Sequence, residues 1–330
     1  MNLAVVILNW NGVKLLKQFL PNVVEHSREA TIYIVDNAST DDSVSYVKAN
    51  FPEVKCIVNS INKGYAGGYN SGLQSIDEDI YILLNNDVAV SDNWLVPILS
   101  AFKSYPEVAV VQPKILDYRN PQFFEYAGAA GGFIDKYGYP FCRGRIFKNI
   151  EKDQGQYDQD TEIFWASGAC FAVRKEVFKK AGKFDEHYFA HQEEIDLCWR
   201  IFNMNYKIWF CYQSQVYHLG GGTLSTLSPK KTFLNFRNSL FNILKNVKPT
   251  EVLFVLFLRL LLDALACLRF LFSFQFKHIL AVLKSHFSFY ANFFLIKNKR
   301  SSSLVPKTYY NINSIIVQYF IHKNKKFSEL

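Results

Sequence analysis

Four short apolar runs recur along the first 84 residues, and each is near-continuous rather than alternating. They occupy residues 3–9 (LAVVILN), 31–35 (TIYIV), 55–59 (KCIVN) and 80–84 (IYILL). Continuous runs of β-branched and aliphatic residues are typical of strands buried on both faces, and the segments between them are long enough for helices. The pattern therefore predicts an α/β fold built on a doubly wound, mostly parallel sheet.

The order loosens after residue 90. Residues 91–102 have a helical pattern and 108–116 resemble a further strand, whereas 117–160 are rich in Gly, Tyr and Arg and show no regular period. Loop-dominated segments of that length inside a compact chain are usually functional, so we expect 117–160 to help select a substrate. A second ordered block is expected from 161 to 222.

Three carboxylates, Glu193, Glu194 and Asp196, lie within four positions at the start of a predicted amphipathic helix. Two interpretations are open. Acids favour the positive end of a helix dipole, and Asp196 can pair with Arg200 at i, i+4, which would make the cluster structural. Alternatively, a carboxylate in this group takes part in a reaction.

Polar side chains follow the predicted strands at the points where they end: Asn9, Asp36, Asn59 and Asp87. In an open parallel sheet the carboxyl ends of the strands line the ligand crevice. Asp36 either closes an ordinary strand-to-helix turn or accepts hydrogen bonds from a nucleoside. Asp87 is either a polar strand cap or a ligand for a hard divalent cation that also binds diphosphate oxygens.

Two further signals are weaker. The run NKGYAGGYNSG, which contains Gly64 and Gly67, would let backbone N–H groups approach a phosphate, but it matches neither GxGxxG nor GxxxxGK[ST]. His218 follows an apparent strand, and a lone histidine is usually an ordinary core or surface residue.

The positive charge lies at the C-terminal end. The chain carries a net charge of +8, and residues 250–330 hold eleven Lys/Arg against three acids, so the whole excess lies in that segment. Residues 252–276 are long enough to cross a bilayer but contain Arg259, Asp263 and Arg269, each costing about 2.5 to 3.5 kcal/mol at a helix centre. We expect a helix lying in the interface of an anionic membrane, with a helix packed on the protein as the alternative.

Other partners and compartments are less well supported. The Leu and Phe density of the tail is too high for a solvated nucleic-acid groove. The six cysteines form no CxxC and no cluster, so neither a zinc site nor a disulfide framework is indicated, and a reducing cytoplasm fits. The opening MNLAVVILNWNG lacks the features of a secretory signal.

Six motifs in order carry a resemblance over roughly the first 240 residues: VVILNWNG, IVDNASTD, NKGYAGGYNSG, LLNNDV, WASGACFAVRKEVFKKAGKFDEHYFAHQEEIDLCWR and VYHLGGGT. The chain resembles the family 2 glycosyltransferases, in particular their rhamnosyltransferase-like branch. The resemblance implies a GT-A fold, a nucleotide-diphosphate sugar donor, a divalent cation (Mn²⁺ or Mg²⁺) and inverting transfer to an acceptor hydroxyl. It divides the chain into a donor-binding half (1–116), an acceptor-binding and catalytic half (117–249) and a membrane-associating tail (250–330).

The resemblance also assigns residues. Asp87 holds the third position of a DxD-like motif whose first two positions are Asn85 and Asn86, and Glu194 holds the position of the catalytic base, with Glu193 as second choice. Trp165 lies in the segment that borders the sugars, where it would stack on a pyranose or serve as a core residue. The expected donor site is Asn9, Asp36, Asn59, Gly64, Gly67, Asn85 and Asn86; the metal site is Asp87 and His218; the acceptor site is Trp165, Ser167, Gly168 and Asp196.

The expected function is transfer of a sugar, rhamnose being one candidate, onto a glycan or polyprenyl-linked glycan in cell-surface polysaccharide synthesis. The enzyme would work on the cytoplasmic, inner face of the cell membrane. Two alternatives stay open. A nucleotidyltransferase would share the sheet-edge acids, although LNWNGVK is a poor match for a triphosphate-binding loop. A nucleotide- or glycan-binding protein without catalysis is conceivable because the first acid of the DxD-like motif is missing.

Overall fold

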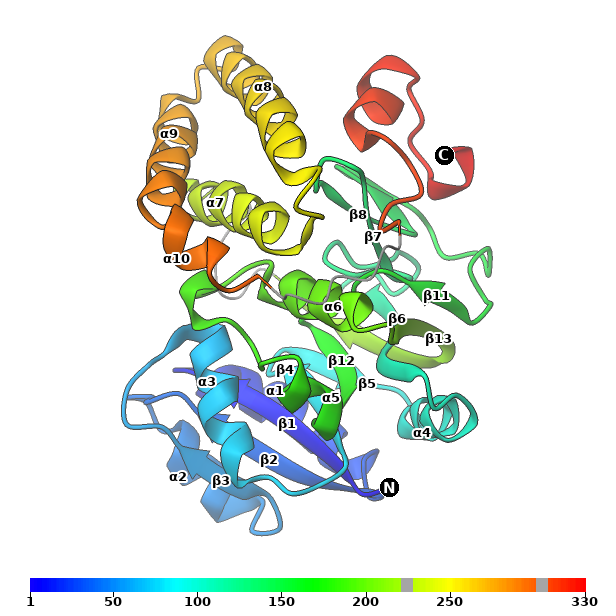
Figure 1. The fold of residues 1–330 in the computed structure, drawn as a ribbon. Coiled ribbons are helices and arrows are strands. Elements are labelled where there is room, and N and C mark those ends of the chain that lie inside the picture. Colours follow the sequence, from blue (N-terminus) through cyan, green and yellow to red (C-terminus); the bar gives the residue numbers. More distant parts are fainter. Residues whose placement is uncertain (221–227, 301–307) are drawn as a thin grey trace.

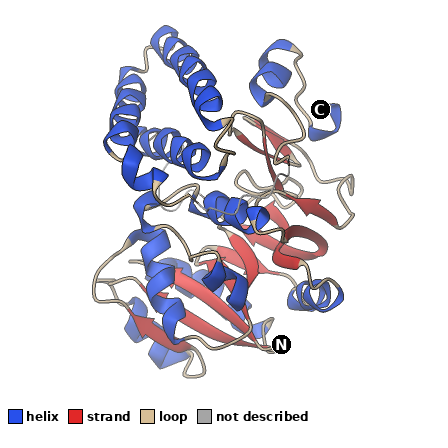
Figure 2. Cartoon of the chain, viewed as in Figure 1, coloured by secondary structure: helices blue, strands red, loops and turns tan. Residues whose placement is uncertain are grey.

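A large mixed β-sheet with helices on both faces forms the centre of the protein in the computed structural model, which describes residues 1–220, 228–300 and 308–330 (Figures 1 and 2). A smaller sheet and a C-terminal group of helices are attached to it. The α/β class expected from the apolar runs is confirmed. The last three residues of the VYHLGGGT motif lie outside the described residues.

The large sheet has nine strands within the described residues, and all four apolar runs form strands in it. Strands β3, β2, β1 and β4 are neighbours and run parallel, whereas β12 lies antiparallel between β4 and β6. The parallel half follows the prediction, and the second half of the chain adds antiparallel strands to the same sheet. The strands are β1 Leu3–Asn9, β2 Ala30–Asp36, β3 Lys55–Val58, β4 Ile80–Asn85, β5 Val88–Val90, β6 Val108–Asp117, β11 Thr161–Ile163, β12 Cys170–Arg174 and β13 Lys207–His218.

Two apolar cores cover the faces of this sheet. One contains the apolar residues of α1, α2 and α4, and the other those of α3, α5, α6 and α7. The central strands are buried on both sides, which explains their near-continuous apolar sequences. These helices are α1 Val13–Glu25, α2 Ser43–Asn50, α3 Gly64–Gly72, α4 Leu95–Ser104, α5 Lys175–Lys180, α6 Glu193–Asn203 and α7 Pro229–Asn246.

The segment 117–160 contains more regular structure than its sequence indicates. It forms a small antiparallel sheet of β7 Gly132–Ile134, β8 Pro140–Cys142, β9 Arg145–Ile146 and β10 Asn149–Ile150. Strands of two or three residues are too short to produce a recognisable period, so the expectation of an irregular segment was wrong in this respect.

The C-terminal region consists of two parts. Helices α8 Val252–Phe272, α9 Phe276–Ala291 and α10 Phe293–Lys297 follow α7, and α7 lies between α6 and the α8–α9 pair (Figure 1). The chain end, from residue 308, instead packs on the small sheet, where the Phe327 and Phe133 rings are 4.9 Å apart. None of the helices in the described ranges is both long and apolar enough to cross a membrane.

Candidate active site

Strands β1 and β2 bring Asn9 and Asp36 together at the carboxyl edge of the sheet, where the two residues are register partners. The Asp36 carboxylate accepts hydrogen bonds from the Ser39 amide (2.8 Å), the Ser39 hydroxyl (2.6 Å) and Asn9 Nδ2 (3.1 Å). These contacts are the strand-to-helix turn that the sequence allowed. They also hold Asp36 rigidly at the edge where a donor nucleoside is expected.

The glycine-rich run forms the whole of α3, whose first turn packs closely on the segment before α6. Gly64 has φ +70°, and a Cβ there would lie 2.6 Å from the carbonyl oxygen of Phe189. The Tyr65 amide donates to that carbonyl (3.1 Å). A Cβ on Gly67 would lie 2.7 Å from Lys63 Cβ and 3.3 Å from a Glu186 carboxylate oxygen. Close packing therefore explains both glycines.

Asparagines connect this edge to the end of β4. Asn59 Nδ2 donates to Asn37 Oδ1 (3.2 Å), and Asn86 Nδ2 donates to Asn9 Oδ1 (2.8 Å). Asn85, at the end of β4, lies beside the imidazole of His218, with Asn85 Nδ2 3.4 Å from His218 Nε2. The predicted donor residues Asn9, Asp36, Asn85 and Asn86 are thus brought to one edge.

His218 lies between two carboxylates. Its Nε2 is 3.1 Å from Asp87 Oδ1 and its Nδ1 is 3.3 Å from Glu125 Oε1. Burial lowers the pKa of His218, but the contacts with Asp87 and Glu125 outweigh it and raise that pKa to about 10. All three side chains are buried.

Glu125 was not predicted from the sequence. It lies in the segment without a regular period, and no motif marks it. An isolated bridge between Leu116 and Phe124, together with the pairing of Asp117 with His218, carries it to the histidine. Only the contact in the folded chain reveals Glu125. In metal sites, a carboxylate on one ring nitrogen commonly fixes the orientation of an imidazole whose other nitrogen binds the metal.

The donor set fits a divalent cation that is completed by a substrate. Asp87 Oδ1 and His218 Nε2 offer one oxygen and one nitrogen ligand 3.1 Å apart, a combination that suits Mn²⁺. Across the described ranges, no group of three or more His, Cys, Asp or Glu side chains is arranged to hold a metal. A cation at Asp87 would therefore need oxygen ligands from a diphosphate.

The two glutamates at the start of α6 differ in environment. Glu193 is 4% exposed and its Oε2 has no hydrogen-bond partner, whereas Glu194 is partly exposed. Burial, followed by the neighbouring Glu194 charge, raises the pKa of Glu193 well above its ordinary value. Burial also raises the pKa of Glu194, to about 7. Burial thus acts on both carboxyl groups, and Glu194 is the one that solvent reaches.

Gly168 leaves space beside Glu194. A Cβ on Gly168 would lie 3.1 Å from the Tyr65 hydroxyl and 3.9 Å from Glu194 Cδ. The Tyr65 hydroxyl donates to the Gly168 carbonyl oxygen (2.9 Å), and the next carbonyl, of Ala169, accepts from the Asn85 amide (2.9 Å). The Glu194 carboxyl group therefore lies near the segment that pairs with Asn85.

The loop that leads into α6 has an unusual backbone. Phe189, His191 and Gln192 all have positive φ (63°, 68° and 69°), a backbone conformation that residues other than glycine seldom adopt. Asn238 of α7 holds this loop by donating to the carbonyl oxygens of Tyr188, Ala190 and His191. A strained segment fixed from outside is typical of an active site.

A model of the family "Glycosyl transferase family 2" matches residues 4–182, which is more than half of the chain. The chain belongs to glycosyl transferase family 2. The match runs from β1 past α5 and includes Asp36 and Asp87, but it ends before Glu193 and His218. The proposed roles of Glu193 and His218 therefore rest on the geometry described above and not on the family match.

Relatives and solved structures agree with this family. The glycosyltransferase is 25% identical over 214 residues to the N-acetylglucosaminyl-diphospho-decaprenol L-rhamnosyltransferase of Mycobacterium tuberculosis, covering 59% of this chain and 68% of that protein. The resemblance to a rhamnosyltransferase-like branch is therefore confirmed.

Two solved structures share its fold. The GalNAc-T7 structure with UDP, GalNAc and Mn²⁺ has a TM-score of 0.57 at 18% identity, over 74% of this chain and 47% of the other. The mannosyltransferase of Pyrobaculum calidifontis with GDP-Man and Mn²⁺ has a TM-score of 0.52 at 13% identity, over 88% of this chain and 74% of the other. The GT-A fold expected from the sequence is confirmed.

The predicted acceptor residues of the glycosyltransferase fall into two groups. Trp165 is 3% exposed, and its Nε1 donates to the Phe133 carbonyl oxygen (2.8 Å), so it is a core residue and not a sugar-stacking surface. Ser167 is also buried, and its amide donates to Gln112 Oε1 (2.8 Å). Only Gly168 of this segment lies beside Glu194.

Asp196 is a structural residue, which corrects its predicted place in the acceptor site. It is fully buried and accepts from Arg200 Nε (2.9 Å), Lys245 Nζ (2.9 Å) and Asn246 Nδ2 (3.0 Å). The pairing with Arg200 at i, i+4 is the one expected from the sequence. Because every oxygen of the carboxylate is engaged by α6 and α7, it fixes these two helices against each other.

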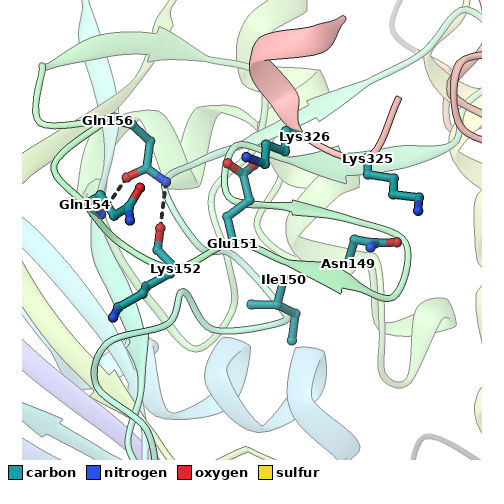
Figure 3. A pocket seen from close by; sticks show the side chains of 8 residues that line it. All are labelled: Asn149, Ile150, Glu151, Lys152, Gln154, Gln156, Lys325 and Lys326. Carbon is teal, nitrogen blue, oxygen red and sulfur yellow. Dashed lines mark hydrogen bonds between the residues drawn. The ribbon is translucent and has the colours of Figure 1, made fainter. Parts of the chain in front are cut away.

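A separate hollow lies away from these residues, between the small sheet and the chain end (Figure 3). It has a volume of about 340 Å³, and on one side of it Gln156 Nε2 donates to the Lys152 carbonyl oxygen (2.8 Å). None of the predicted site residues lines it. The lining residues are Asn149, Ile150, Glu151, Lys152, Gln154, Gln156, Lys325 and Lys326.

Proposed function

We propose that this family 2 glycosyltransferase transfers a sugar from a nucleotide-diphosphate donor to a hydroxyl of a glycan or polyprenyl-linked glycan, with inversion at the sugar carbon. Rhamnose is the first sugar to test, because the Mycobacterium tuberculosis relative is named an L-rhamnosyltransferase that acts on a diphospho-decaprenol glycan. Cell-surface polysaccharide synthesis is the setting that this chemistry suggests.

One observation supports the proposal above all others: hydrogen bonds join the donor edge to the metal ligands, and the Glu194 carboxyl group lies near the same edge. Asn86 donates to Asn9, and Asn9 in turn donates to Asp36. The side chain of Asn85 contacts His218, and its backbone N–H donates to the carbonyl oxygen of Ala169. Ala169 follows Gly168, beside which Glu194 lies. A donor at this edge would place its reacting carbon between a cation site and a base.

Asp87 and His218 would hold the divalent cation, and Glu125 would orient His218 from its other ring nitrogen. When bound, such a cation neutralises the charge that develops on the departing nucleoside diphosphate. The missing acid at position 85, the first position of the DxD-like motif, does not remove this function, because a substrate diphosphate supplies further oxygen ligands.

Glu194 would act as the base that removes the proton from the acceptor hydroxyl. It is partly exposed, it has space beside it at Gly168, and burial raises its pKa to about 7, which suits proton transfer at neutral pH. Glu193 is buried without a hydrogen-bond partner for Oε2, and burial raises its pKa well above the ordinary value, so it is the second choice. A nucleotidyltransferase has no support from the family match.

The test is a transfer assay with purified enzyme, Mn²⁺ or Mg²⁺, and a panel of nucleotide-diphosphate sugars that includes rhamnose donors. A diphospho-polyprenol carrying N-acetylglucosamine serves as acceptor, and the anomeric configuration of the product is read by NMR. Transfer with inversion supports the proposal. Binding of a donor without transfer or hydrolysis, at any acceptor tested, would indicate a binding protein.

We also propose that the enzyme works as a peripheral protein on the inner face of the cell membrane. The positive charge excess of residues 250–330 supports this location. A lipid-linked acceptor would be reached from that surface.

A further inference from the structure

The outer side of the α8–α9 helical hairpin is an apolar surface of unusual extent. We call it the hairpin face; Phe274, in the turn between the two helices, is 81% exposed. Contiguous exposed apolar surface of this kind is rare on soluble monomers and marks an interaction site. The hairpin face consists of Leu253, Phe254, Phe257, Leu261, Leu265, Leu268, Leu271, Phe272, Phe274, Phe276, Leu280, Leu283 and Phe287.

The two central charges of α8 are not on this face. Arg259 is 3% exposed and donates from Nη1 to Ser239 Oγ (2.7 Å) and from Nε to Asp263 Oδ1 (2.8 Å). Asp263 is 1% exposed and also accepts from the Tyr139 hydroxyl (3.0 Å). The charges that oppose lipid contact in the sequence are therefore turned toward α7 and the small sheet.

The exposed charges that remain on α8, α9 and α10 are all positive: Arg269, Lys277, Lys284 and Lys297. Asp263 is the single acidic residue between 252 and 300, and it is buried. An apolar stripe flanked by basic residues matches an anionic bilayer, in which the acyl chains accept the stripe and the headgroups accept the cations.

We infer that the hairpin face is a lipid-docking surface that inserts shallowly into an anionic membrane, with Phe272, Phe274 and Phe276 at the turn inserted deepest. This inference rests on the membrane location proposed above and names the residues that produce it. A second copy of the chain is a less suitable partner for the hairpin face, because a two-fold interface through this face would bring the positive charges of the two copies together.

The docking surface is connected to the catalytic loop through α7. Ser239 Oγ accepts a hydrogen bond from Arg259 of α8. The neighbouring residue Asn238 donates hydrogen bonds to the loop at residues 188–191. Because α7 packs on α6 as well as on α8 and α9, the base at the start of α6 has a fixed position relative to the hairpin. Docking would hold the active site at a constant distance from lipid-borne acceptors.

The test is sedimentation of the full-length enzyme with vesicles of phosphatidylcholine alone and with an equal mixture of phosphatidylcholine and phosphatidylglycerol. We expect binding to the mixed vesicles that weakens with salt. The triple variant Phe272→Ser, Phe274→Ser, Phe276→Ser should reduce the bound fraction at least tenfold. The control Val96→Ser removes an apolar side chain that is 56% exposed on α4, outside the hairpin face, and should bind normally.

Circular dichroism checks that the triple variant is folded, and a charge variant, Lys277→Glu with Lys284→Glu, provides a second test by losing preference for the anionic vesicles. No vesicle assay uses a donor or acceptor, so its outcome is independent of the proposed reaction. Full binding by the triple variant would overturn the inference. So would a dimer in lipid-free solution that the triple variant converts to a monomer, because the partner would then be a second copy.

Discussion

Asn238 and Ser239 are consecutive buried residues of α7 that bind two different parts of the chain. Asn238 Nδ2 donates to the carbonyl oxygens of Tyr188 (3.2 Å), Ala190 (3.0 Å) and His191 (2.7 Å), and Ser239 Oγ accepts from Arg259 Nη1 (2.7 Å). One helix therefore fixes both the loop that leads to Glu194, the proposed base, and the hairpin that carries the exposed apolar face.

Replacing Asn238 by alanine should slow the reaction without removing any group that touches substrate. The three carbonyl groups lose their hydrogen-bond donor, so fewer contacts stabilise the positive-φ backbone conformation at His191. We expect kcat to fall about tenfold or more with little change in the KM of the donor. Steady-state kinetics measure this, and Ser239→Ala is the matched control, because it leaves the loop untouched.

Glu194→Gln should lose about 10² to 10⁴-fold in kcat, because the acceptor hydroxyl then has no base. Binding of donor and Mn²⁺, measured by calorimetry, should be retained. Glu193→Gln is nearly isosteric, and burial raises the pKa of the carboxyl that it replaces well above its ordinary value, so turnover should stay close to that of the wild type. The reverse pattern would move the base to Glu193.

Activity should rise with pH through about 7. Burial raises the pKa of Glu194 to about 7, so below that pH the carboxyl is protonated and cannot accept a proton. We expect kcat/KM to fall about tenfold per pH unit on the acidic side and to level off above pH 7. Glu194→Gln should flatten the acidic limb. An acidic limb that persists in this variant would assign the titration to another group.

Asp87→Asn should abolish transfer while the protein stays folded, because the variant removes the carboxylate ligand and leaves the side-chain volume unchanged. Electron paramagnetic resonance of Mn²⁺ in the presence of a nucleoside diphosphate should show loss of the bound signal. Excess chelator should have the same effect on the wild-type enzyme. Full activity in chelator would contradict a metal role for this residue.

Glu125→Gln should weaken Mn²⁺ binding about 10- to 100-fold without removing a direct ligand. The carboxylate contacts His218 Nδ1, so its loss frees the imidazole to rotate away from Asp87. Titration of Mn²⁺ by electron paramagnetic resonance measures the change independently of activity. Glu151→Gln, in the hollow of Figure 3, is the matched control and should bind Mn²⁺ like the wild type.

The sequence by itself determined the parallel half of the sheet and the placement of polar residues at its carboxyl edge. Strands such as 3–9 and 80–84 are specified by continuous apolar side chains, and a parallel arrangement brings their ends together. It also determined the pairing of Asp196 with Arg200, which depends only on helix geometry. The excess positive charge of the last 81 residues was likewise visible without a structure.

The tertiary structure decided the rest, because those features depend on contacts between residues far apart in the chain. Glu125 reaches His218 across 93 positions, and no local pattern marks it. Arg259 and Asp263 would oppose lipid contact if they were exposed, but Ser239 and Tyr139 bind them on the inner side of α8. For that reason these two charges are absent from the hairpin face. The helix period determines the spacing of side chains, but only packing against the rest of the protein decides which side of the helix faces outward.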